Sequence, residues 1–330
     1  MAGTSQPPPL AGPASVARRP APETGHGGVS RNRRVKRLTG IDRLIVVLMV
    51  AVPLLLTTVL VWLPAIATVL LSFTSWNGIG DFSRIKWIGL KNYHDVVTIY
   101  PAFWPAVRHN IIWLVVLFLV ATPAGIFLAV LIDKGLRGSR FYQTSIYMPV
   151  VLSLALIAFI WQLQFSADFG VLNSVLQGLH LTDQPIDFFG EPKYNLWAAL
   201  AATCWRHIGY IMLLYLAGLK GVDPSLREAA QVDGATEVQT FFRIVFPVMR
   251  PINVIVFVIT VIESLRAFDL VWVINKGRNG LELLSALVTS NVVGEASRIG
   301  FGSALATIML VISVVFIVIY LSTVFREEER

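Results

Sequence analysis

Five ionisable residues lie inside long apolar stretches of the sequence: Arg206, His207, Glu263, Arg266 and Asp269. A charged side chain in such a setting is costly unless it meets a partner or a water-filled cavity. Two kinds of chemistry are therefore open to this set. The residues could form hydrogen bonds with a polar cargo that crosses a membrane, or they could carry a proton or an ion.

A structural role is an equal alternative for Glu263 and Arg266. The two residues stand three apart in the sequence, which is the spacing of an ion pair within one helix. The sequence alone leaves both interpretations of this pair open.

Aromatic residues accompany the charged ones near residue 206. On a helix, Arg206, His207 and Tyr210 occupy an arc of about 100°, with Trp205 beside it. Aromatic rings cover the apolar C–H faces of a sugar, while charged groups bond its hydroxyls. The predicted substrate-pathway residues are Trp205, Arg206, His207, Tyr210, Glu263, Arg266 and Asp269.

Motifs for catalysis are missing from the sequence. It contains no G-x-x-x-x-G-K-[ST] phosphate loop, no G-x-S-x-G elbow and no HExxH pair. The five histidines are scattered, and the one cysteine, Cys204, lies in an apolar stretch. We therefore predict a non-catalytic chain without a catalytic residue, a metal site or a cofactor of its own.

The composition is that of a membrane protein. Of the 330 residues, 55% are hydrophobic and only 14% are charged, and the mean hydropathy is +0.68. Six apolar stretches reach the length of about 20 residues that a membrane helix needs. Continuous apolar runs exclude a barrel of alternating strands, so the predicted fold is all-α with six transmembrane helices. The predicted spans are 44–73, 110–132, 143–165, 195–218, 252–274 and 304–325.

Basic residues predict the orientation of these spans. With the amino terminus inside, 17 of the 27 Lys and Arg residues fall on the cytoplasmic side and eight on the other. Both termini are then cytoplasmic, in the plasma (inner) membrane. Residues 1–38 are basic and rich in Pro and Ala, and we predict a disordered tail there, ahead of a transmembrane domain at 39–330.

A polar segment at 224–247 interrupts the apolar runs on the predicted cytoplasmic side. Ser225 and Glu228 have the spacing of a capping box, with Asp223 and Pro224 as alternative start signals. Gly234 suits a turn with a positive φ, and Thr236 with Gln239 repeats the capping spacing. The segment is predicted to be a helix, a turn and a second, amphipathic helix that needs a partner surface.

This segment resembles the EAA loop of ABC-transporter permeases. The resemblance rests on Glu228-Ala229-Ala230, three further residues, Gly234, nine residues, Ile244, one residue, and Phe246-Pro247, where the family usually has Leu-Pro. It implies a coupling helix that docks into a cytoplasmic ATPase subunit, which holds the ATP and Mg. The implied coupling residues are Glu228, Ala229, Ala230, Asp233, Gly234, Ala235, Phe242, Ile244 and Pro247.

Residues 88–110 and 140–173 extend the resemblance to the MalF-type sugar permeases, whereas 275–280 departs from that pattern. The resemblance implies a subunit of an ATP-driven importer of a sugar or oligosaccharide. Its expected partners are a second permease, two ATPase subunits and an extracytoplasmic sugar-binding protein. An ion-coupled secondary transporter that uses Glu263, Arg266, Asp269 and His207 is the alternative, and a membrane scaffold without cargo is a third interpretation.

Overall fold

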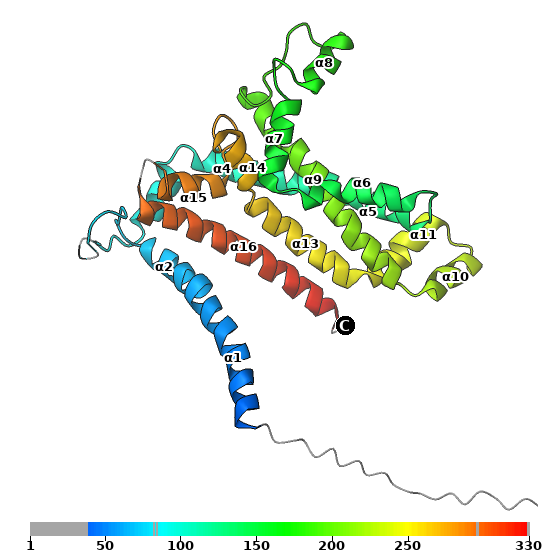
Figure 1. Ribbon diagram of the computed structural model, residues 1–330, viewed down its shortest axis with the longest axis horizontal. Helices are drawn as coiled ribbons and strands as arrows, with labels where there is room; N and C mark the ends of the chain where they lie inside the picture. Colours follow the sequence, from blue (N-terminus) through cyan, green and yellow to red (C-terminus); the bar gives the residue numbers. More distant parts are fainter. Residues whose placement is uncertain (1–38, 82, 84, 295–296, 329–330) are drawn as a thin grey trace, which may run out of the picture. The chain divides into compact units, whose positions relative to one another are not determined.

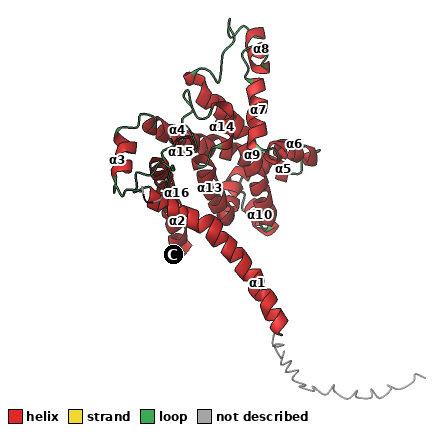
Figure 2. Cartoon of the chain, turned by 60° about the vertical axis from the view of Figure 1, so that its left-hand side comes forward, coloured by secondary structure: helices red, strands yellow, loops and turns green. Residues whose placement is uncertain are grey.

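The computed structural model describes residues 39–81, 83, 85–294 and 297–328. The predicted disordered tail at 1–38 lies outside these residues. The chain divides into two compact units, 1–55 and 56–330. In the described part of the chain the regular structure is helical, apart from one isolated bridge between Thr74 and Trp87 (Figure 2).

Four helical stretches are long and apolar enough to cross a membrane: Gly40–Leu71, Phe103–Asp133, Pro192–Gly221 and Ile299–Tyr320. Two pairs of helices reach the same length and composition only with a bend between them. Ser139–Val151 and Leu154–Gln164 meet at 103°, and Glu237–Val248 and Arg250–Asn275 meet at 78°. By length and composition alone, the described residues thus supply six spans if each bent pair counts as one.

The span predicted at 143–165 is bent, because the chain leaves the helical conformation inside it. Helix α6 (Ser139–Val151) ends two residues after Pro149, and Leu152 and Ser153 are extended. Ser153 then caps α7 (Leu154–Gln164), since its hydroxyl accepts a hydrogen bond from the Leu156 N–H at 3.2 Å. The stretch at 252–274 is likewise divided, into α13 (Arg250–Leu265) and α14 (Asp269–Asn275).

Three π-helical turns interrupt the long helices, and each has a proline close behind it. The turns are η1 (Thr58–Trp62), η3 (Leu117–Ala121) and η4 (Phe241–Val245). The helices that follow are α2 (Leu63–Leu71), α5 (Thr122–Asp133) and α12 (Phe246–Val248), each with proline at its start. A proline ring clashes with the carbonyl four residues earlier, and in all three cases that residue lies in the π turn. The wider turn relieves the clash.

The helix α9 (Pro192–Gly221) packs against α5, α6, α7 and α13 (Figure 1). Glycines allow the closest of these contacts. A Cβ on Gly125 of α5 would lie 2.8 Å from the Ile211 Cβ, and one on Gly209 would lie 2.3 Å from the Ile146 carbonyl oxygen of α6. Small residues at such crossings let membrane helices approach closely. Helices α5, α6 and α9 therefore form one tightly packed group.

The remaining helices complete the unit at 56–330. They are α3 (Lys91–Thr98), α4 (Phe103–Val116), α8 (Val171–Gly178), α10 (Pro224–Val232), α11 (Glu237–Thr240), α15 (Leu284–Val292) and α16 (Ile299–Glu328). Helix α1 (Gly40–Thr57) lies in the first unit except for its last two residues. Helix α16 packs against α2, α3, α13 and α15. Helices α3 and α10 lie at opposite ends of the unit (Figure 2).

Candidate functional site

The polar segment at 224–247 forms the predicted helix, turn and helix. Asp223 caps α10, because its Oδ1 accepts a hydrogen bond from the Ser225 N–H at 2.9 Å, and Pro224 is the first helical residue. This bond, together with the Ser225 hydroxyl, lowers the pKa of the Asp223 carboxyl. The alternative start signal is therefore confirmed, and the capping box of Ser225 with Glu228 does not form.

The second half of the segment begins as the sequence predicts. The Thr236 N–H donates to Gln239 Oε1 at 2.9 Å, and the Gln239 N–H donates to Thr236 Oγ1 at 3.3 Å, which completes a capping box. Between the two halves, Gly234 has a φ of +75°. Only glycine, and to a lesser extent asparagine, adopts that conformation readily.

Four large apolar side chains on this segment are exposed. Val232 is 88% exposed, Val238 66%, Phe242 63% and Leu226 38%, among surface residues that are mainly polar. Gathered apolar side chains on a polar surface are typical of a protein docking site. Of the nine predicted coupling residues, six are exposed, Ala235 and Ile244 are half-buried, and Ala230 is buried. The exposed six are Glu228, Ala229, Asp233, Gly234, Phe242 and Pro247.

Two ion pairs fasten the segment to the end of α5. The Arg227 guanidinium of α10 donates to Asp133 Oδ2 at 2.8 Å and to the Leu219 carbonyl oxygen of α9 at 3.3 Å. Lys134, next to Asp133, pairs with Glu237 of α11. The two halves of the segment on either side of Gly234 thus have separate attachments to neighbouring residues. We name this arrangement, Asp133–Arg227 with Lys134–Glu237, the α5 clamp.

The distal end of the segment is joined to α9 and α13. Asn253 of α13 donates to the Phe246 carbonyl oxygen at 2.9 Å and accepts from the Tyr215 hydroxyl of α9 at 2.7 Å. Phe241 and Phe246 pack against the buried cluster that contains Tyr215. The segment is therefore joined to α5, α9 and α13 by direct bonds and packed rings.

Sequence reasoning missed the α5 clamp. Asp133 and Lys134 lie about 100 residues before their partners, and nothing in the local pattern links them. The one available signal is that opposite charges stand side by side at the cytoplasmic end of a predicted span. Such a pair is also common on solvated surfaces, so the signal is weak.

Inside the apolar region, Glu263 pairs with Arg206 and not with Arg266. The Arg206 Nη1 lies 3.5 Å from Glu263 Oε2, which joins α9 to α13. Arg266 follows the last residue of α13, where the helix has ended, so the spacing of three no longer brings it onto the same face. Of the two alternatives for Glu263 and Arg266, the ion pair within one helix does not form between them in the described structure, because Glu263 pairs with Arg206 on another helix.

Four predicted pathway residues line one cavity of about 160 Å³: Arg206, Glu263, Arg266 and Asp269. Two polar groups near it are buried and lack hydrogen-bond partners among the described residues, the Nε of Arg206 and the indole N–H of Trp113. Trp113 also lines the cavity and is 1% exposed. Buried donors without partners are costly, and they indicate a place where water or a polar cargo completes the bonding.

The other predicted pathway residues point elsewhere. His207 is 2% exposed, and its Nε2 lies 3.3 Å from the Thr260 hydroxyl of α13. Tyr210 packs beside the buried cluster around Met212. Trp205 meets Trp161 edge-on at 5.8 Å and lines a separate, mainly apolar cavity of about 370 Å³. The structure thus does not gather all seven residues into one site.

Comparisons with known proteins show the family of this chain. A sequence model of the family described as "Binding-protein-dependent transport system inner membrane component" matches residues 121–326. A probable ABC transporter permease of Pyrococcus horikoshii is 28% identical over 86% of this chain and 97% of its own length. A xylose/arabinose import permease of Haloferax volcanii is 32% identical over 74% of this chain and 76% of its own.

A solved structure has the same fold. It is a bacterial alginate ABC transporter in complex with a periplasmic protein that holds an alginate pentasaccharide. The likeness covers 84% of this chain and 93% of that one, with a TM-score of 0.72 and 20% sequence identity. The all-α fold of an ABC importer permease is therefore confirmed.

Proposed function

This chain belongs to the binding-protein-dependent transport system inner membrane components, the permeases of ABC importers, and we propose that its cargo is a sugar or an oligosaccharide. A related permease imports xylose and arabinose, and the solved neighbour carries an alginate pentasaccharide on its periplasmic protein. The mixed charged and aromatic residues around Arg206 fit a cargo with many hydroxyls. The particular sugar is left to experiment.

The chain forms half of the translocation pathway in this proposal, beside a second, related permease. Arg206, Glu263, Arg266 and Asp269 contact the cargo from one cavity, and Trp205 offers an aromatic face from the neighbouring one. His207 and Tyr210 act as positioning residues of α9, because both pack against other helices.

Coupling to ATP hydrolysis runs through the segment at 224–247. One observation carries this part of the proposal: a polar helix pair presents the uncovered Val232, Val238 and Phe242, while the α5 clamp and Asn253 bond it to the membrane helices. Two cytoplasmic ATPase subunits bind there, together with the ATP and Mg that this chain has no motif to hold. The permease itself is non-catalytic. Its termini are cytoplasmic, and a sugar-binding protein docks on the opposite face.

The ion-coupled carrier lacks support, because the family match and the relatives are ABC importer components. Glu263 is also already paired with Arg206. A paired carboxylate is a poor carrier of a proton unless the pair breaks in each cycle.

Uptake by proteoliposomes tests the proposal. The vesicles contain the full transporter with ATP inside, and the loaded binding protein is added outside, while ionophores collapse every ion gradient. We expect uptake of a sugar from a panel of xylose, arabinose and maltose, and no uptake without internal ATP. Uptake that stops with the gradients and continues without ATP would overturn the proposal.

A further inference from the structure

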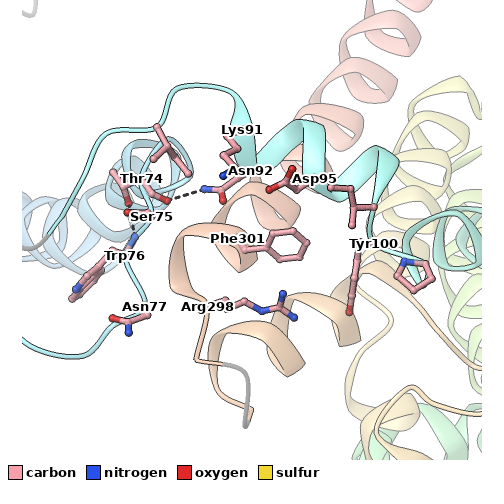
Figure 3. Close-up of a pocket in the computed structure, with 13 residues that line it drawn as sticks. Thr74, Ser75, Trp76, Asn77, Lys91, Asn92, Asp95, Tyr100, Arg298 and Phe301 are labelled. Atoms are coloured by element: carbon pink, nitrogen blue, oxygen red, sulfur yellow. Dashed lines mark hydrogen bonds between the residues drawn. The ribbon is translucent and has the colours of Figure 1, made fainter.

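A cavity of about 600 Å³ opens at the end of the unit opposite α10, where three segments distant in sequence meet (Figure 3). One wall is the loop at 74–77, the second is α3 with the residues that follow it, and the third is the start of α16. We name it the α3–α16 cavity. Its volume lies within the range of about 300–1,000 Å³ that small-molecule sites occupy.

The walls of this cavity are fixed in place without a ligand. The buried Asn92 donates from its amide to the carbonyl oxygens of Ser72 and Thr74, both at 2.8 Å. The Gly300 N–H donates to the Trp76 carbonyl oxygen at 2.8 Å, and a Cβ on Gly300 would lie 2.1 Å from the Thr74 oxygen. Glycine at 300 is thus required for the loop to approach α16. Binding in a cavity that is already formed costs little conformational entropy, because the walls do not have to become ordered.

The lining combines groups of both charges with aromatic faces. Lys91 and Asp95 stand four apart on one face of α3, and in the described structure they make no ion pair with each other. The Asp95 Oδ1 lies 3.5 Å from the Nδ1 of the exposed His94, and its other carboxylate oxygen makes no described ion pair. Arg298 lies with its guanidinium 5.1 Å from the centre of the Phe301 ring, and in the described part of the chain no carboxylate pairs with it. Asn77, Trp76 and Tyr100 complete the polar and aromatic lining (Figure 3).

We propose that the α3–α16 cavity is a saccharide-binding site on the extracytoplasmic face, separate from the cavity around Arg206. Hydroxyl groups both donate and accept hydrogen bonds, so they match a lining that holds a carboxylate together with cationic donors. The apolar C–H faces of a sugar match Trp76 and Tyr100. The site lies where cargo released by the binding protein first meets this chain, so the inference rests on the proposed function.

Two other occupants fit the lining less well. An anionic phospholipid headgroup is repelled by the Asp95 carboxylate, for which it has no partner. A single side chain of the binding protein fills only a small part of 600 Å³. A sugar ring uses the carboxylate, the cations and the rings together, and we take it as the occupant.

Thiol labelling in the assembled transporter tests the inference. In a Cys204→Ala background, Asn77→Cys places a thiol at the cavity mouth, and Asp81→Cys is the matched control on the exposed loop beyond it. The probe is the sugar of the panel that the vesicles take up. We expect that sugar, added at millimolar concentration without the binding protein, to slow maleimide labelling at 77 and not at 81.

A second variant removes the carboxylate of Asp95, the proposed hydrogen-bond acceptor for the sugar hydroxyls. Asp95→Asn is expected to abolish the protection at 77 and to raise the KM for uptake about tenfold, the loss that one charge-assisted hydrogen bond produces. Asp81→Asn is the matched control and leaves the KM unchanged. The affinity of the transporter for the loaded binding protein is measured in parallel and is expected to stay the same.

Three results would each overturn the inference. The first is that the transported sugar does not slow maleimide labelling at position 77. The second is that the binding protein slows this labelling only when it carries no sugar. The third is that the labelling is slowed by anionic lipid and not by sugar. In all three, uptake of the sugar continues, so the proposed function survives. Failure of uptake itself is a separate result that concerns the proposed function.

Discussion

Gly234 sets the shape of the segment at 224–247, the proposed coupling segment, through its backbone conformation and not through the space around it. Its φ is +75°, and a Cβ at this position would meet nothing within 4 Å. An L-residue in that conformation costs about 1–2 kcal/mol, and asparagine tolerates it best. We therefore expect Gly234→Val to reduce the stimulation of ATPase activity by the loaded binding protein severalfold.

Gly234→Asn is the matched control for this substitution. It adds a side chain of similar size and is expected to keep most of the stimulation. Equal losses in both variants would mean that a contact of Gly234 with the partner, and not the turn, matters.

A substitution of Glu263 distinguishes a structural role of the charged residues in the apolar region from a role in binding cargo. Its carboxylate is the partner of Arg206 at 3.5 Å and lines the cavity of about 160 Å³. If the cavity binds cargo, Glu263→Gln raises the KM for sugar uptake about tenfold, because a charge-assisted hydrogen bond is lost, and the melting temperature of the complex changes little. A fall in melting temperature with an unchanged KM would favour the structural role.

The types of these residues were predictable, but their partners were not. An ionisable residue in an apolar stretch is easily recognised in the sequence. The pairing of Glu263 with Arg206, in contrast, depends on how α9 and α13 cross. His207 is a second case in which the residue type did not predict the surroundings. It lies on the polar face of its helix, yet it is buried against Thr260.

At the scale of elements, the α5 clamp joins the coupling segment to the membrane helices. Asp133 is 15% exposed and Arg227 36%, so this pair is screened less than the pair of Lys134 with Glu237, at 49% and 79%. We expect Asp133→Arg to uncouple ATP hydrolysis from uptake, which shows as a higher ratio of ATP hydrolysed to sugar imported. A hydrogen bond to a charged group contributes about 1.5–3 kcal/mol.

The reversed pair supplies the rescue test. Asp133→Arg combined with Arg227→Asp restores the attraction and should return the ratio towards normal. The same exchange of charges at Lys134 and Glu237 is the control and is expected to have little effect, because exposed pairs contribute about 0–1 kcal/mol. If the double variant is no better than the single one, the pair does not transmit the movement.

The crossing of α6 and α9 depends on Gly209. A Cβ there would lie 2.3 Å from the Ile146 carbonyl oxygen, so Gly209→Ala forces the helices apart at a cost of about 1–3 kcal/mol. The melting temperature of the purified complex should fall. Gly221→Ala, on the same helix with nothing within 4 Å of its Cβ, is expected to leave it nearly unchanged; a similar fall in both would contradict the packing argument.

The helical class of the fold followed from the sequence, and the bends in the helices did not. The capping box at Thr236 and the turn at Gly234 are local patterns, so they could be predicted. The bend after Pro149 could not, because a proline inside a membrane helix is compatible with a straight span, a kink or a break. Packing decides among these outcomes.

At the scale of the whole molecule, the account assigns opposite faces of the membrane to two parts of the chain. In the proposed orientation, the segment at 224–247 faces the cytoplasm and the α3–α16 cavity faces outward. Hydropathy and the distribution of basic residues predicted this orientation. The comparisons confirm the predicted all-α permease fold, whereas the length and composition of the described helices leave the count of spans between four and six.

Cross-linking from two exposed valines tests directly whether the segment at 224–247 binds the ATPase subunit. Val232 in the coupling segment is 88% exposed, and Val293 near the α3–α16 cavity end is 78% exposed. Each is replaced by cysteine in the Cys204→Ala background, and in the assembled transporter that thiol is labelled with a maleimide that carries a short photoreactive arm, which inserts into a neighbouring chain on irradiation. The account predicts that Cys at 232 cross-links to the ATPase subunit and that Cys at 293 does not. Cross-linking of the ATPase from 293, or none from 232, would contradict it.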